Sequence, residues 1–586
     1  MEGYKNQVLR VDLSSKSFTT EPLNMEWAKK YIGGKGLGIK YLYEELAPGV
    51  DPLSPANKLI LMTGPFTGTV VPCSGKLALI SRSPATGTIL DCSIGGHIAA
   101  ELKFAGYDAF ILEGKAPSPS YLYVENQRVE VRHAGELWGL GSHKTEDILR
   151  EKYGEDVKIL TIGPAGENLL PMACISSEYY RQAGRGGIGA VMGSKNLKAV
   201  VVKGTLGVKT ANMETILDRV QEIMREDTLS ETTFWAYTDG TPMIVDLSQS
   251  TGILPTRNFQ DGTFPGFTGI NSDAMKAARA GKKACVSCGL GCGNFTRIGD
   301  EVVEGPEYET LALCGSNCGI DDLKAVIAFN KACDDLGLDT ISAGNITALA
   351  MEMTEKGLHD FGLRFGEVES YLKVPELMAK KEGIGAELAV GARELAKRYG
   401  GQDFAMEVKG LEFPGYEPRG SWSMGLAYAT ADRGACHMRA WPVADEAYGD
   451  LDPFTSEGKA ELVIGLQHDH AVKFSTILGD FGAVSLDTLA EVLSLVTGAE
   501  FTAAGLEKTG ERVVNIARLF NQREGFNVKD DYLPARIFDH PLQSGATEGK
   551  VLPREDFEKM RSEFYALRGW QEDGSVGLEK QEDLEV

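Results

Sequence analysis

The hydrophobic pattern of the chain changes near Thr210, and this change predicts two kinds of architecture. Before it, short apolar segments are separated by turns rich in glycine, proline, serine and threonine, which is typical of β-strands. These segments do not alternate regularly with long helices, so a doubly wound sheet is not indicated. The predicted strands are residues 8–13, 59–63, 76–81, 109–113, 121–124, 157–162 and 199–202.

Beyond Thr210, apolar residues recur at helical spacing. Residues 213–225 carry Ile216, Val220 and Ile223 on one helical face. We also expect a glycine-rich loop at 410–425 and a solvated acidic end after Glu572. The other predicted helices are 322–336, 346–356, 374–380, 386–399, 486–496 and 503–519. The sequence therefore predicts an α+β fold, with a β-rich first part and a mainly α-helical remainder.

Length and charge exclude several classes of protein. The chain has 586 residues, and domains usually contain roughly 100–200, so we expect about three of them. No apolar run reaches the roughly 20 residues that a membrane span needs, and residues 1–13 lack the pattern of a secretory signal. The net charge of −23 disfavours nucleic acid, whose phosphates need a basic face. We expect a cytoplasmic protein with neither a nucleic-acid nor a membrane partner.

Three of the ten cysteines crowd into eight residues, at Cys285, Cys288 and Cys292. Thiolates at this spacing can converge on one metal centre, and the intervening Gly289 and Gly291 let the loop bend around it. Structural zinc also uses such pairs, and both zinc and a four-iron cluster need a fourth ligand. The remaining alternative is that the three cysteines are buried and unrelated to one another. Spacing alone leaves these alternatives open.

Four other features are weaker evidence for a functional site when each is taken alone. The segment 185–189, Arg-Gly-Gly-Ile-Gly, exposes backbone N–H groups that can hold phosphate, although it matches neither a dinucleotide nor a Walker pattern. Asp334 and Asp339 lie where a helical pattern ends in a turn, and acidic residues are common at such positions even when they bind no ligand. Glu309 lies one residue from another glutamate across a tyrosine, and His437 is a single histidine, which is more often packed than catalytic.

Short motifs nevertheless follow one another along nearly the whole chain. They begin with Thr-Gly-Pro-Phe-Thr-Gly at 63–68 and Ser-Arg-Ser-Pro-Ala-Thr-Gly at 81–87, and they end with Arg-Gly-Trp at 568–570. Between these lie 95–96, 101–108, 183–194, 285–292, 305–310, 334–339, 433–439 and 518–525. In this order they resemble the aldehyde ferredoxin oxidoreductase family of tungstopterin enzymes.

The resemblance implies three domains with a buried cofactor between them. Residues 1–210 would form the β-rich pterin-binding base, 211–417 a mainly helical domain with the cysteine motif and the aspartate pair, and 418–586 a mainly helical domain with the active-site histidine. It also implies a tungsten-dependent oxidoreductase that oxidises aldehydes to carboxylic acids. Electrons would pass through a 4Fe-4S iron–sulfur cluster to ferredoxin or an iron–sulfur partner subunit.

The resemblance further implies a bis-pterin tungsten or molybdenum cofactor with magnesium. The basic side chains would face the pterin phosphates, and the small residues would approach through their backbone, where carbonyls hold magnesium between the phosphates. The paired acids would each accept from two N–H groups of a pterin's amino edge. The cofactor-binding residues implied are Lys76, Ser93, Gly95, Arg181, Ala183, Arg185, Asp334 and Asp339.

Glu309 and His437 match the family's pair beside the metal. A carboxylate can activate water or take a proton, and an imidazole can polarise a carbonyl. The sequence departs from the family at the fourth cluster cysteine, because the matching segment 473–481 contains none and no cysteine follows Cys436. We expect Asp480 as the fourth ligand, with an iron that an oxygen ligand leaves labile, and His468 or His470 as its rivals. A solvated turn residue is the alternative explanation for Asp480.

Three other functions remain compatible with the sequence. The same cofactors could serve a reductive subunit of a larger complex acting on acids or thioesters. A protein without pterin could only transfer electrons or act as a scaffold, and a zinc-stabilised binding protein would carry no redox group. A homodimer is compatible with the sequence, which names neither the aldehyde nor the choice between tungsten and molybdenum.

Overall fold

The structure is a computed structural model that describes residues 1–482 and 484–586, and the side chains of residues 227 and 228 are outside this description. Two six-stranded sheets form the N-terminal part. The first, in the order β2-β1-β6-β3-β4-β5, comprises β1 (Val8–Asp12), β2 (Ser17–Glu21), β3 (Leu59–Met62), β4 (Leu77–Arg82), β5 (Ile89–Ile94) and β6 (Ala109–Glu113). The second, in the order β11-β10-β9-β12-β7-β8, comprises β7 (Ser120–Glu125), β8 (Arg128–His133), β9 (Lys158–Thr161), β10 (Ile175–Ser177), β11 (Arg181–Ala183) and β12 (Leu197–Lys203).

The inner strands of both sheets are buried on both faces, and this explains why they are nearly continuously apolar. In β1, Leu9 and Val11 enter the core that the two sheets share, whereas Val8 enters the core on the opposite face. Helices α3 (Ile98–Phe104) and α6 (Ile188–Ser194) contribute to the shared core. The outer layers comprise α1 (Met25–Tyr31) and α2 (Gly34–Glu45) on the first sheet, and α4 (Ser142–Tyr153) with the short α5 (Pro164–Glu167) near the second.

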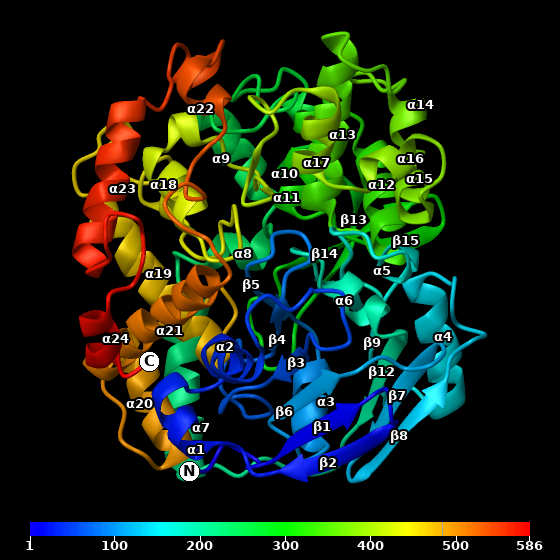
Figure 1. Ribbon diagram of the computed structural model, residues 1–586, viewed down its shortest axis with the longest axis vertical. Coiled ribbons are helices and arrows are strands. Elements are labelled where there is room, and N and C mark those ends of the chain that lie inside the picture. The colour runs from blue at the N-terminus through cyan, green and yellow to red at the C-terminus, as the bar shows by residue number, and fades with distance from the viewer. Residues whose placement is uncertain (483) are drawn as a thin grey trace.

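The rest of the chain is mainly helical and lies above and to the left of the sheets in Figure 1. A first group comprises α7 (Met213–Ile223), α8 (Phe234–Thr238), α9 (Met243–Thr251), α10 (Ser272–Ala278), α11 (Tyr308–Thr310), α12 (Leu323–Leu336), α13 (Thr340–Glu355), α14 (Val368–Tyr371), α15 (Val374–Lys380), α16 (Ile384–Leu388) and α17 (Ala392–Tyr399). The second comprises α18 (Trp422–Thr430), α19 (Lys459–Thr476), α20 (Leu486–Thr497), α21 (Ala503–Arg523), α22 (Ala535–Asp539), α23 (Arg554–Arg568) and α24 (Leu578–Leu584). Small sheets comprise β13 (Arg279–Lys283), β14 (Gly293–Ile298) and β15 (Glu301–Glu304), and β16 (Glu407–Val408) with β17 (Leu411–Glu412).

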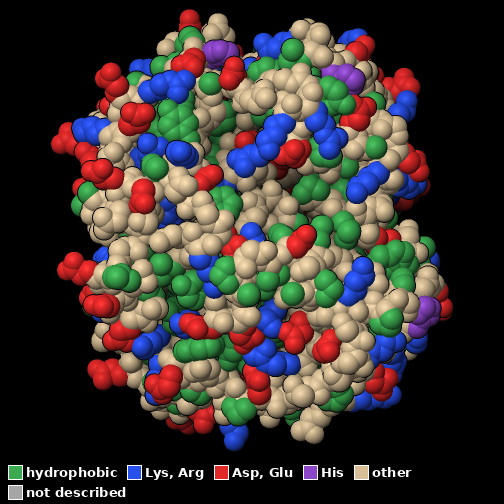
Figure 2. Space-filling view, in the orientation of Figure 1, with side chains coloured by type: hydrophobic (Ala, Val, Ile, Leu, Met, Phe, Trp, Pro, Cys, Tyr) green, Lys and Arg blue, Asp and Glu red, His purple; other side chains and the backbone are tan. Residues whose placement is uncertain are grey.

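The predicted α+β fold class is confirmed, with the β-rich part first and the helical parts after it. The division into 1–210, 211–417 and 418–586 stays a prediction. No helix in the described part of the chain is long and apolar enough to cross a membrane. On the face shown in Figure 2, acidic and basic side chains are interspersed and form no continuous basic patch.

Local predictions were wrong at two places and incomplete at a third. The acidic side chains of the C-terminal end are exposed as predicted, but the segment also forms α24, whose Leu584 is buried and whose Leu584 carbonyl accepts a hydrogen bond of 2.7 Å from Arg512 Nε. The helix predicted at 386–399 divides into α16 and α17, with Gly391 between them at a φ of 89°. The predicted loop 410–425 contains β17 and the start of α18. In each place a tertiary contact or a backbone turn overrides the local pattern.

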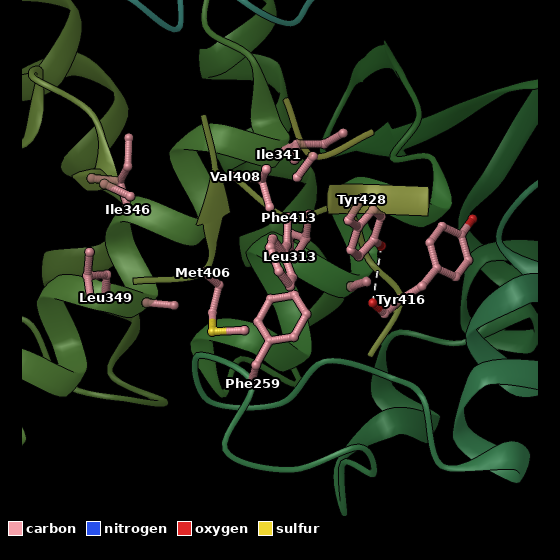
Figure 3. Packing of buried hydrophobic residues seen from close by; sticks show 14 of the residues in the cluster. Phe259, Leu313, Ile341, Ile346, Leu349, Met406, Val408, Phe413, Tyr416 and Tyr428 are labelled. Atoms are coloured by element: carbon pink, nitrogen blue, oxygen red, sulfur yellow. Dashed lines mark hydrogen bonds between the residues drawn. The ribbon is translucent and has the colours of Figure 1, made fainter. Parts of the chain in front are cut away.

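A buried core joins the segments of the helical part that surround the later site. In Figure 3, Phe259, Leu313, Met406 and Phe413 pack together, and all four are buried. The Tyr428 hydroxyl donates to the backbone carbonyl of Tyr416 at 3.1 Å. These contacts hold the segment after β17 in a defined place beside α11.

Buried charges tie the first sheet to the C-terminal helical part. Lys35 Nζ of α2 lies 2.9 Å from Asp91 Oδ1 of β5 and 2.5 Å from Asp432 Oδ2. Arg439 Nε lies 2.7 Å from Asp432 Oδ1, and its Nη2 also pairs with Asp91. Removing one partner from such a network leaves a buried charge uncompensated, at a cost of about 3–5 kcal/mol. The network therefore fixes the position of the segment that carries His437.

Candidate active site

A cavity of about 520 Å³ lies between the β-rich part, the cysteine loop and the helical parts. This volume is within the usual range for a bound small molecule or cofactor, roughly 300–1,000 Å³. Most of the residues predicted from the sequence line it: Lys76, Ser93, Gly95, Arg181, Cys285, Cys288, Cys292, Glu309, Asp334, Asp339, His437 and Asp480. Ala183 and Arg185 are buried beside the cavity and are not part of its lining.

The three clustered cysteines lie on the loop that connects β13 to β14. This loop is docked on the β-rich part, since Val286 N donates to Gly96 O at 3.1 Å and Ser287 Oγ donates to Thr69 O at 2.9 Å. A Cβ at Gly95 would lie 2.7 Å from Cys285 Sγ, so only glycine allows this approach. The β-rich part thus orients the thiols toward one end of the cavity.

A fourth cysteine, which the sequence analysis missed, lies at the same end. Cys73 Sγ is 3.8 Å from Cys288 Sγ. Its backbone is held on both sides, because Cys73 N donates to Ser287 O at 2.8 Å and Gly479 N donates to Cys73 O at 2.7 Å. The available signal was its place three residues before the predicted Lys76. No group of three or more His, Cys, Asp or Glu side chains within residues 1–482 and 484–586 converges as a ready single-ion site.

The three residues considered for the fourth cluster ligand have different surroundings. Asp480 Oδ2 accepts a hydrogen bond from Lys76 Nζ, and Oδ1 is buried without a hydrogen-bond partner among the described residues. His470 lines the cavity, with Nδ1 at 2.8 Å from the Met438 carbonyl oxygen. His468 lies outside the lining and accepts from Arg568.

Glu309 and His437 meet at the cavity wall. Glu309 Oε1 lies 3.6 Å from His437 Nε2, and Oε2 accepts a hydrogen bond of 2.8 Å from Gly415 N. Burial raises the pKa of Glu309 to about 8. Burial, and then the positive charges of Arg185 and other arginines, lower the pKa of His437 well below its ordinary value. Near pH 7 the pair therefore consists of a protonated carboxyl and a neutral imidazole.

The aspartate pair lies on the neighbouring wall with a structural role of its own. Asp339 caps α13, accepting from Ile341 N at 3.3 Å and from Ser342 N at 3.1 Å. Asp334 accepts from Gln182 Nε2 at 3.3 Å, and burial raises its pKa well above the ordinary value. The turn and helix-end explanation therefore holds for Asp339, while both carboxyls also face the cavity.

Two comparisons with protein-family models cover the chain. The model described as the aldehyde ferredoxin oxidoreductase N-terminal domain matches residues 8–204, and the model for domains 2 and 3 of that enzyme matches residues 215–586. The chain belongs to the aldehyde ferredoxin oxidoreductase family. It is an oxidoreductase of that type.

Known relatives are similar to this chain along its full length. A tungsten-containing aldehyde ferredoxin oxidoreductase of Pyrococcus furiosus is 40% identical, over all of this chain and 99% of the relative. The WOR-like subunit of an aliphatic sulfonate oxidoreductase from the same organism is 30% identical, over 100% and 97%. The active-site complex BamBC of benzoyl coenzyme A reductase has the same fold, with a TM-score of 0.86, 24% identity, and coverage of 100% of this chain and 97% of that one.

The residues present fit the pterin and cluster that this family implies. Thiolates suit an iron–sulfur cluster, and four of them lie at one end of the cavity. Polar atoms elsewhere on the lining are buried without a hydrogen-bond partner in the described part of the chain: Arg181 Nε, Glu309 Oε1, His437 Nδ1 and Asp480 Oδ1. Burying a polar atom without a hydrogen-bond partner costs free energy unless a bound group supplies the missing contact. A pterin-bound metal cofactor would be such a group.

The role of Arg185 as a phosphate partner stays a prediction, and the structure shows contacts of its guanidinium within the cavity wall. Its Nη1 donates to Ala435 O at 2.6 Å, its Nη2 donates to Glu412 O, and its Nε lies 3.8 Å from Asp339 Oδ2. The guanidinium is thus held in the wall, where it orients the segment before His437.

Two further acids on the lining, Glu304 and Glu307, were also missed as site residues. Burial raises the pKa of both carboxyls. Glu304 ends β15 and Glu307 precedes α11, so a regular element does not predict that both face the cavity. Their position is decided by the turn between these two elements.

Proposed function

We propose that this family member oxidises aldehydes to carboxylic acids and passes the electrons through an iron–sulfur cluster to ferredoxin or a partner subunit. The observation that carries the proposal is the Glu309–His437 pair, 3.6 Å apart on a cavity that cysteine thiols also line. The full-length identity of 40% to an enzyme named for this activity supports it. The cytoplasm is the compartment we propose, because free thiols persist there.

The reaction joins an aldehyde and water and yields a carboxylic acid, two protons and two electrons. A C–O bond to the water oxygen forms, and the C–H bond of the aldehyde breaks. Glu309, once ionised, is placed to take the proton from water, and His437 is placed to donate a hydrogen bond to the carbonyl oxygen. When bound, the pterin-held tungsten or molybdenum would accept the electron pair and the cluster would pass the electrons on singly.

Aromatic side chains beside the pair suit the organic part of the substrate. The Tyr416 ring lies 5.7 Å from the His437 ring and 6.0 Å from the Trp441 ring, measured between centroids, and all three residues line the cavity. Such a wall accommodates an apolar chain or ring while the carbonyl faces Glu309 and His437.

The remaining cavity residues would hold the cofactor. Lys76 and Arg181 would pair with pterin phosphates, and backbone carbonyls near Ser93 and Gly95 would hold magnesium, which would offset the phosphate charge. Asp334 and Asp339 would accept from the amino edges of the pterins. These roles stay proposals, as do the domain limits and a homodimer.

Glu309→Gln and His437→Ala test the function. Each should retain tungsten and iron while turnover with several aldehydes falls by about 100-fold or more, as expected for lost acid–base groups. The exposed Glu572→Gln serves as the control and should keep normal turnover. Near-normal rates in either active-site variant would contradict the role given to that residue, and zinc without tungsten, molybdenum or iron would contradict the whole proposal.

A second candidate is a reductive subunit acting on acids or thioesters. It is favoured by the pKa of about 8 at Glu309, since a protonated carboxyl can donate a proton, and by the full-length relative that is itself named a subunit. The pH dependence separates the two. Aldehyde oxidation requires the ionised carboxylate, so kcat/KM should rise with pH toward about 8, whereas a reduction that requires the acid should slow above that pH.

A further inference from the structure

We propose that Cys73 is the fourth ligand of the iron–sulfur cluster, in place of the downstream cysteine that this chain lacks. The inference rests on the proposed function in that it assumes a cluster at Cys285, Cys288 and Cys292. It assigns to the β-rich part a ligand that the resemblance to the family implies in the C-terminal part.

The first argument is the position of the thiol. Cys73 Sγ lies 3.8 Å from Cys288 Sγ, and the two residues are 215 positions apart in the chain. Both thiols line the same cavity as Cys285 and Cys292. Four thiols from two segments thus line the same cavity, which is the number that a four-iron cluster needs.

The second argument is the backbone that holds Cys73. Its φ is 60°, a left-handed conformation that is uncommon for a residue other than glycine, asparagine or aspartate. Hydrogen bonds to the cysteine loop and from Gly479 keep it in this conformation. A Cβ at Gly482 would lie 3.8 Å from Cys73 Sγ. Two segments therefore orient this thiol toward the cysteine loop, at a conformational cost that a purely packed side chain would not require.

The third argument concerns Asp480, the ligand expected from the sequence. Its Oδ2 is bound by Lys76 Nζ, and both side chains are largely buried. Only Oδ1, which is buried without a hydrogen-bond partner in the described part of the chain, remains available to bind iron. Iron in such clusters is held by thiolates, so the Cys73 thiol is the better ligand and Asp480 keeps its contact with Lys76.

The chemistry of the cluster follows from this assignment. Four thiolates hold all four irons, so the cluster should survive mild oxidation as a four-iron species. A carboxylate at the fourth iron would make that iron labile and yield a three-iron form. The ligand set can therefore be identified from the cluster alone, without any assay of turnover.

The test compares anaerobically purified wild type with Cys73→Gly and Asp480→Asn. Glycine suits the φ of 60° and leaves space at the thiol position. Cys318→Ala is the control, because this cysteine is buried in the helical core away from the cavity. Iron and sulfide are quantified, and electron paramagnetic resonance is recorded after dithionite and after ferricyanide treatment. 2-Mercaptoethanol added to Cys73→Gly supplies an external thiolate.

Wild type, Asp480→Asn and Cys318→Ala should share one four-iron signal when reduced. Cys73→Gly should show a three-iron signal after oxidation and lose about a quarter of its iron, and the added thiol should restore the four-iron signal. A wild-type signal in Cys73→Gly, or a three-iron signal in Asp480→Asn alone, would overturn the assignment while leaving the cluster in place. A wild type that contains zinc and no iron would instead refute the proposed function.

Discussion

Replacing Glu309 by Gln should change how the stability of the cofactor-free protein depends on pH. Gln has the shape of a protonated Glu, and its carbonyl can still accept the hydrogen bond from Gly415 N. It cannot ionise. The difference in unfolding free energy between variant and wild type therefore isolates the cost of ionising this one buried carboxyl.

The magnitude follows from the pKa shift. Burial raises the pKa of Glu309 from 4.5 to about 8, and each pH unit corresponds to about 1.4 kcal/mol. Because the folded-state pKa is above the unfolded one, the stability contribution is complete below pH 4.5 and is lost as pH rises toward 8. Wild type should lose roughly 5 kcal/mol at most over this range through Glu309, while Glu309→Gln loses none of it.

The measurement is a thermal or urea unfolding series between pH 5 and 9 on protein from cells grown without tungstate or molybdate. The unfolding free energy of the variant relative to wild type should increase by up to about 1.4 kcal/mol per pH unit until pH 8 and then stay constant. Glu572→Gln, at an exposed position, should run parallel to wild type. If Glu309→Gln also runs parallel to wild type, Glu309 is ionised in the folded protein at neutral pH and its role as a proton donor near pH 7 is refuted.

Three further predictions concern the surrounding fold. Burial, then nearby positive charge, lowers the pKa of His468 to about 3, so the stability that the neutral imidazole contributes above pH 6.5 should be lost as pH falls toward 3. The unfolding free energy of His468→Gln should therefore fall less steeply with decreasing pH than that of wild type. Gly34→Ala should lower the melting temperature far more than Gly49→Ala, because a Cβ at Gly34 would lie 2.1 Å from a backbone carbonyl of α19 whereas Gly49 has nothing within 4 Å. Asp432→Asn should cost about 3–5 kcal/mol in urea unfolding, since two buried cations lose part of their pairing; a change below about 1 kcal/mol would contradict this.

Several inner strands of the β-rich part could be predicted from the sequence because they are apolar and buried on both faces. The strand predicted at 109–113 coincides with β6, and the helix predicted at 374–380 coincides with α15. The predictions missed β2, whose residues are mostly exposed, and the helix α19. Helix α19 contacts α2, α18, α21 and α23 and so buries residues on several faces. Its apolar residues therefore do not form the single stripe that predicts a helix.

Some residues of the candidate site could likewise be predicted from the sequence, and others could not. The cysteine loop and the Glu309 and His437 motifs could be found from the sequence because each is a short local pattern. Cys73 was not found, since its one local signal, a place three residues before Lys76, does not indicate that it meets the cysteine loop. The pairing of Asp480 with Lys76 was likewise hidden, because the two residues are 404 positions apart.

The sequence by itself determined the fold class, the family, and the chemical types gathered for one site, because periodicity and short motifs depend on neighbouring residues. Only the tertiary structure decided which distant groups meet. The layers of sheet and helix bring Cys73 to Cys288 and Glu309 to His437, and they turn Arg185 into the wall. The physical reason is that such contacts depend on how whole elements pack, and packing is set by buried surfaces from every part of the chain at once.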